Sequence, residues 1–159
     1  MYIYNRSITI TMDRMDVKGQ ASVEYLLLTL IFLIIIGSIT VPLISQGVSD
    51  SLDVSHSSDA SAALNSIANA VGVVYANGPE SQRNITVYFS NTGTLSYVSP
   101  TIQMPVNITG GNKLISANVP ITVTFVPSPM NIAAKNNYNV EVYWPAGSSS
   151  IMVSMTEIT

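Results

Sequence analysis

The sequence contains no cysteine and only one histidine, His56, and charged residues occupy just 9% of its 159 positions. Without cysteine the chain can form no disulfide framework, no cysteine-ligated metal site and no thiol nucleophile. A Ser-His-Asp site would have to use His56, and the sequence has no Gly-x-Ser-x-Gly elbow, Walker loop or His-Glu-x-x-His motif. We therefore expect neither an enzyme nor a cofactor.

The few charges also restrict the partners and the metal sites. Nine acidic residues outnumber six basic ones, for a formal net charge of −3, whereas a nucleic-acid partner would require a basic patch. Asp50, Asp53, His56 and Asp59 alone have the character of metal ligands at helical spacing. They lack the spacing and the glycine of an EF-hand. We expect a solvated polar face there and no metal site.

One long apolar run dominates the N-terminal part of the chain. No charge occurs from Tyr25 to Ser49, and residues 26–36 are apolar on every helical face. A membrane-spanning helix needs about 20 such residues, and the chain that follows is too short to bury this one on all sides. A secretory signal peptide would have a shorter apolar core, roughly 7–15 residues, and a small-residue cleavage site after it. The run therefore predicts a membrane-inserting helix over 25–45.

Basic residues predict the orientation of this helix. Arg14 and Lys18 precede it, and the next basic residue is Arg83. The positive-inside rule then places the N-terminus in the cytoplasm and the C-terminal part of the chain outside.

The junction before the apolar run carries a recognisable motif. Its sequence is Lys18-Gly19-Gln20-Ala21-Ser22-Val23-Glu24-Tyr25, which contains Gln-x-Ser-x-Glu-aromatic. This junction resembles that of archaeal type IV pilins with a class III signal peptide. The resemblance covers 18–42.

The resemblance implies a processing event and a set of partners. A prepilin peptidase would cut between Gly19 and Gln20 and remove the leader 1–19, with its basic Arg14 and Lys18, or a shorter leader that starts at Met15. Before assembly, the chain would reside in the cell membrane. An assembly ATPase and a membrane platform would then add it to copies of itself in an extracellular pilus, for surface adhesion. A minor pilin or pseudopilin, or a single-pass anchored extracellular binding domain, are the alternatives.

Two residues of this region carry expected roles in assembly. After the cut, the new amino group of Gln20 lies about one helical turn from Glu24, and a carboxylate near a helix N-terminus is favoured by the macrodipole. We interpret Glu24 as setting the axial register between subunits, although it could also simply rest at the headgroup level. Pro42 removes a helical hydrogen bond, and neighbouring groups in a bundle can compensate. It is therefore a point where the helix could melt locally during assembly.

Helical spacing resumes after a serine-rich stretch. Its apolar stripe has the spacing i, i+3, i+4, i+7 and consists of Leu64, Ile67, Ala68, Val71, Val74 and Tyr75. Asn77-Gly78-Pro79 should end it. We predict one long helix over 20–76, with an amphipathic half over 59–76, a bend or loosening between Pro42 and Gly47, and a second possible break at 57–59.

Strand signals fill the rest of the chain. Alternation of apolar and polar residues over 85–89, 121–125 and 138–144, with turn residues between, predicts about six to eight short antiparallel strands. The expected fold class is α+β, in which an extracellular β-sheet or sandwich domain over 80–159 has one face covered by the helix stripe.

Two sequons lie in this outer domain, at Asn84 and Asn107, and a third lies at Asn5. Three sequons are also the number expected by chance, so their count is no evidence of glycosylation. Only export of the domain would make them usable. The alternation predicts that Asn84 and Asn107 face solvent. N-glycosylation at either remains an open alternative at this point.

Overall fold

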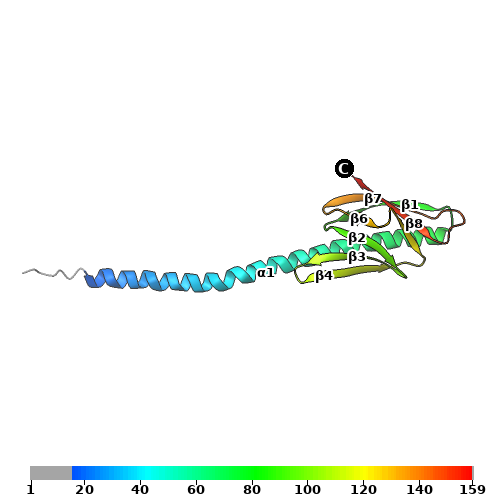
Figure 1. The fold of residues 1–159 in the computed structure, drawn as a ribbon. Coiled ribbons are helices and arrows are strands. Elements are labelled where there is room, and N and C mark those ends of the chain that lie inside the picture. The colour runs from blue at the N-terminus through cyan, green and yellow to red at the C-terminus, as the bar shows by residue number, and fades with distance from the viewer. Residues whose placement is uncertain (1–15, 159) are drawn as a thin grey trace, which may run out of the picture. The chain divides into compact units, whose positions relative to one another are not determined.

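The computed structural model describes the backbone of residues 16–158 and the side chains of residues 22–158. One helix is followed by eight strands (Figure 1). The elements are α1 (Asp16–Asn77), β1 (Gln82–Phe89), β2 (Gly93–Val98), β3 (Thr101–Ile108), β4 (Gly111–Asn118), β5 (Val123–Val126), β6 (Met130–Ile132), β7 (Asn136–Tyr143) and β8 (Ile151–Ile158). The predicted α+β class, with a long apolar N-terminal helix, is confirmed.

The long helix passes through both positions at which a weakness was expected. Pro42 lies inside α1, where it has no N–H to donate to the carbonyl of Ser38. The chain divides into two units between Gln46 and Gly47, close to this proline. The possible break at 57–59 is absent, because α1 continues through these residues. Weak intrinsic propensity there is overridden by the packing that begins at Ala60, which is buried.

Gly78 ends α1 as predicted. Its φ of 87° is open to glycine at little cost, and its N–H donates to the carbonyl oxygen of Val74 at 3.1 Å. The hydroxyl of Ser81 also donates to Val74 O, at 2.9 Å. Both bonds therefore satisfy one carbonyl of the last turn, that of Val74, where the chain turns towards β1.

The strands form two four-stranded sheets, with orders β1-β7-β8-β5 and β4-β3-β2-β6. All pairs are antiparallel except β5 with β8, which run parallel with Val123 opposite Ile151. The sheets are therefore rich in antiparallel pairs, as predicted, and the one parallel pair was not anticipated. The chain leaves the first sheet after β5 to form β6 in the second sheet, and it returns through β7, so β8 can approach β5 in the same direction.

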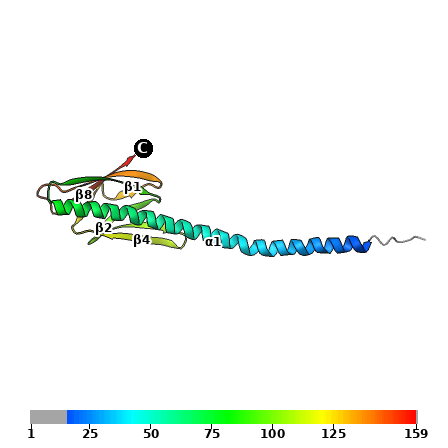
Figure 2. The same cartoon turned by 180° about the vertical axis from the view of Figure 1, so that it is seen from behind.

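One core joins α1 to both sheets. In Figures 1 and 2 the C-terminal part of α1 runs alongside the strands, with β1 and β8 on one side of it and β4 on the other. The predicted stripe residues Leu64, Ile67, Val71 and Val74 are fully buried. Alternate strand residues complete the cluster, among them Phe89, Met104, Val140 and Val153. The predicted alternation over 85–89, 121–125 and 138–144 is confirmed at the buried residues Val87, Phe89, Val123, Phe125, Tyr138, Val140 and Val142.

Tyr75 departs from the predicted stripe. It is 46% exposed, and its ring stacks on Trp144 with the centroids 5.8 Å apart and an interplanar angle of 16°. Trp144 also donates from Nε1 to the carbonyl of Ser148 at 2.8 Å. Tyr75 thus covers the rim of the core rather than filling it.

Candidate functional site

The N-terminal part of α1 presents an extensive apolar surface. Nineteen large apolar side chains lie between Val23 and Val54, and all are exposed, from 49% for Ile31 to 78% for Tyr25. A soluble monomer rarely exposes a contiguous apolar patch of this extent. The segment requires cover from lipid or from other protein.

Polar side chains within this segment form hydrogen bonds to their own helix. Thr29 Oγ1 donates to the carbonyl of Tyr25 at 2.8 Å, and Ser38 Oγ donates to the carbonyl of Ile35 at 2.8 Å. Such back-bonding satisfies the hydroxyls internally, so they remain compatible with an apolar environment.

Among the described residues, α1 is the one helix long and apolar enough to cross a membrane. None of the residues in its most apolar window is buried inside the protein, which distinguishes it from the core helix of a soluble domain. The helix could therefore anchor the chain in a membrane.

The predicted processing and assembly residues fall at the start of this helix. Arg14 lies outside the described residues. Lys18, Gly19 and Gln20 have helical backbone within α1, and their side chains are not described. Glu24 is exposed on the helix surface, one turn after Gln20, a rise of about 6 Å.

Asp53 has a contact that sequence reasoning missed. Its Oδ2 accepts a hydrogen bond from the backbone N–H of Thr109 at 2.8 Å, so it attaches the turn between β3 and β4 to α1. Within residues 22–158, no group of three or more acidic or histidine residues could hold a metal ion. Asp53, one of the four helical Asp and His residues, therefore makes a structural contact. The spacing of residues 53 and 109 along the sequence gives no sign of it.

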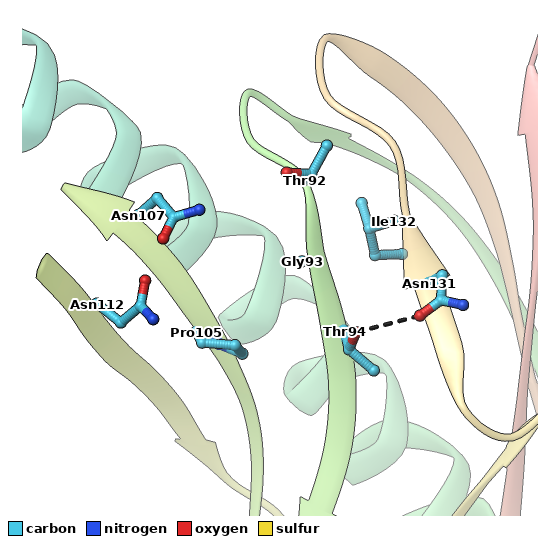
Figure 3. A pocket seen from close by; sticks show the side chains of 8 residues that line it. All are labelled: Thr92, Gly93, Thr94, Pro105, Asn107, Asn112, Asn131 and Ile132. Atoms are coloured by element: carbon cyan, nitrogen blue, oxygen red, sulfur yellow. Dashed lines mark hydrogen bonds between the residues drawn. The ribbon is translucent and has the colours of Figure 1, made fainter.

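Asn84 and Asn107 are both exposed, as the alternation predicted. Asn84 lies opposite Glu141 of β7, on the outer face of the first sheet. Asn107 lies opposite Asn112 of β4, on the outer face of the second. Figure 3 shows the amides of Asn107 and Asn112 turned towards each other.

A hollow of about 410 Å³ opens on this outer face of the second sheet (Figure 3). All four strands contribute to its lining, which consists of Thr92, Gly93, Thr94, Pro105, Asn107, Asn112, Asn131 and Ile132. Thr94 Oγ1 donates to Asn131 Oδ1 at 3.1 Å across β2 and β6. These residues are scattered along the sequence and come together only through the strand order β4-β3-β2-β6.

The described residues thus combine an exposed apolar helical segment with a domain that buries its own core. The apolar segment fits attachment to a membrane or to other chains, and the domain presents a folded polar surface. Comparison of the chain with protein-family models, with curated proteins and with solved structures finds no match in any of the three.

Proposed function

We propose that the chain is a structural subunit of an archaeal type IV-like pilus, assembled through the apolar segment of α1. A prepilin peptidase cuts between Gly19 and Gln20, and the helix remains on the mature chain. The observation that carries the proposal is the exposed apolar surface from Leu26 to Val54, which directly follows the Gln20-x-Ser22-x-Glu24-Tyr25 junction.

The energetics favour a membrane reservoir. Exposing a single Val, Leu, Ile or Phe side chain to water costs about 1.5–3 kcal/mol relative to burying it, and nineteen large apolar side chains are involved. A free soluble subunit would therefore aggregate. Lipid tails are as apolar as leucine, so helices that pass from the bilayer into a bundle must gain mainly from close packing. The apolar segment of α1 is thus covered by lipid before assembly and by neighbouring helices afterwards.

Glu24 has a defined role in this scheme. A carboxylate surrounded by packed apolar helices costs several kcal/mol unless it is paired. The amine of Gln20 created by cleavage is the available partner, on the same chain or on a neighbouring one. Pairing between chains would set their axial register, and a misplaced subunit would leave both charges unpaired.

The same scheme assigns the remaining parts of the chain. Arg14 and Lys18 hold the leader in the cytoplasm, and the β domain lies outside and forms the surface of the pilus, where it adheres to other surfaces. An assembly ATPase and its membrane platform drive extrusion of the polymer.

Fractionation of cells that express the chain tests the proposal. Shearing should release most of the protein as filaments, and membranes should retain the unassembled remainder. A trace amount in filaments dominated by another subunit would instead identify a minor pilin. Recovery only from membranes would identify an anchored surface domain and reject the polymer.

A further inference from the structure

We infer that the hollow on the outer face of the second sheet binds a neutral sugar residue. The inference goes beyond the proposed polymer and does not depend on it, since an anchored surface domain would carry the same hollow. It rests on the shape of the hollow, on the uncharged chemistry of its lining and on the hydrogen-bonding capacity that the fold leaves free there.

The hollow lies beyond the last paired residues of β2 and β3. Their register ends where Ser96 lies opposite Gln103. A Cβ placed on Gly93 would lie 2.5 Å from the terminal methyl carbon of Met104 and 3.0 Å from the carbonyl oxygen of Pro105. Glycine therefore allows a close approach of the two backbones. The carbonyl group of Pro105 points towards β2, but proline has no N–H to donate. Pro105 therefore cannot complete the hydrogen-bonded ladder with β2. The backbones of β2 and β3 therefore form the base of the hollow.

The lining is polar without charge. Thr92, Thr94, Asn107, Asn112 and Asn131 provide two hydroxyls and three amides, and Pro105 adds an exposed apolar ring, whereas Ile132 borders the hollow but has its side chain in the core. No carboxylate, ammonium or guanidinium group lines it. Phosphate and carboxylate ligands are bound most strongly through charge-assisted hydrogen bonds from Arg and Lys, and metal cations are bound mainly by acidic oxygens. The lining therefore favours a neutral ligand.

The neutral character distinguishes this hollow from two others on the domain. Two hollows lie between α1 and β1, and each contains a charged residue in its lining, Asp59 in one and Arg83 in the other. The outer face of the first sheet carries Glu141. By contrast, the residues that face outwards around the hollow on β3 and β2 are Gln103, Ser96, Thr101 and Val98.

The free hydrogen-bonding groups match a polyhydroxyl ligand. Asn131 uses Oδ1 to accept from Thr94, which leaves both of its N–H donors for a ligand. Within residues 22–158, the amides of Asn107 and Asn112 make no side-chain hydrogen bond to the protein. Amides and sugar hydroxyls each donate and accept, and the exposed ring of Pro105 can contact the C–H face of a sugar ring. The volume of about 410 Å³ lies within the range of roughly 300–1,000 Å³ for ligand pockets.

A glycan attached to the chain itself would compete for this hollow. Asn107-Ile108-Thr109 is a sequon, and attachment would consume the Asn107 side-chain nitrogen and place a sugar over the hollow. Binding of an external sugar therefore requires that Asn107 is unmodified.

Ligand-observed NMR on the full chain provides the test, in a detergent without a sugar headgroup. The probes are the methyl glycosides of glucose, galactose, mannose and N-acetylglucosamine, with methyl glucuronide as the charged comparison. At least one neutral glycoside should bind more tightly than the glucuronide, with an affinity that changes little between low and high salt. Asn112→Ala should weaken this binding about tenfold. Asn139→Ala, at an exposed position of β7 on the outer face of the first sheet, should leave it unchanged.

Three results would overturn the inference. One is the failure of every neutral glycoside to bind, and another is undiminished binding by Asn112→Ala with its fold intact by circular dichroism. The third is an intact mass showing a glycan that Thr109→Ala removes, because the hollow would then hold the chain's own sugar. Thr109→Ala retains the backbone N–H that Asp53 binds, so the domain should stay folded.

Discussion

The carboxylate of Asp53 accepts a hydrogen bond from the backbone N–H of Thr109 at 2.8 Å, across 56 residues of sequence. The bond attaches the turn between β3 and β4 to the helix at a point seven residues before the buried stripe begins at Ala60. It satisfies a backbone donor in a turn that is otherwise exposed. Asp53 thus extends the contact between helix and domain beyond the apolar core.

Replacement of Asp53 by alanine should loosen this turn. Loss of one partly exposed hydrogen bond should lower the free energy of unfolding by about 1 kcal/mol, and amide exchange should accelerate at Thr109 and its neighbours. Hydrogen exchange of the full chain in detergent measures the effect. Asp50→Ala removes an exposed carboxylate from the same helix and serves as the control. Equal exchange rates in the two variants would show that the contact is unimportant.

The apolar residues of α1 should fall into two classes. Leu64 is fully buried and Leu52 is 53% exposed, so the same substitution probes both. Leu64→Ala should destabilise the domain by about 2–5 kcal/mol, whereas Leu52→Ala should change its stability by about 0.5 kcal/mol or less. Thermal unfolding in detergent separates the two. Comparable losses at both positions would mean that Leu52 is buried in the folded chain.

Gly19→Phe should block removal of the leader. The resemblance places the cut directly after Gly19, where a bulky ring would obstruct the peptidase. The precursor should accumulate, visible as slower gel migration. Gly37→Phe is the matched control, since a Cβ at Gly37 meets nothing within 4 Å and phenylalanine suits an apolar span. Normal processing of Gly19→Phe would exclude this site.

Glu24→Ala should allow cleavage and impair polymerisation. Without the carboxylate, the amine of Gln20 would lie unpaired among apolar helices, at a cost of several kcal/mol. The yield of sheared filaments should drop at least about tenfold while the mature chain remains in membranes. Asp50→Ala again supplies the control for loss of one negative charge from α1. Full filament yield from Glu24→Ala would remove the proposed role in register.

Periodicity in the sequence predicted most of the fold, because burial follows it directly. The stripe from Leu64 to Val74 and the alternation in β1 and β7 appear as predicted. The stripe was misjudged at Tyr75, since an aromatic side chain at the end of a helix can leave the core to stack on a partner such as Trp144.

Features made by long-range pairing could not be read from the sequence. The parallel pair of β5 and β8, the bond from Thr109 to Asp53 and the hollow beside Pro105 all join segments that are distant along the chain. Local propensity carries no information on which strands become neighbours. The sequons Asn84 and Asn107 were placed correctly on outer faces, but only the strand order shows that Asn107 shares a hollow with Asn112 and Asn131.

N-terminal sequencing of the chain recovered from sheared cell-surface filaments tests the central proposal most directly. We predict a mature chain that begins at Gln20 and retains the whole apolar segment of α1. A first residue beyond Ile44 would mean that this segment had been discarded, and polymerisation through it would be contradicted.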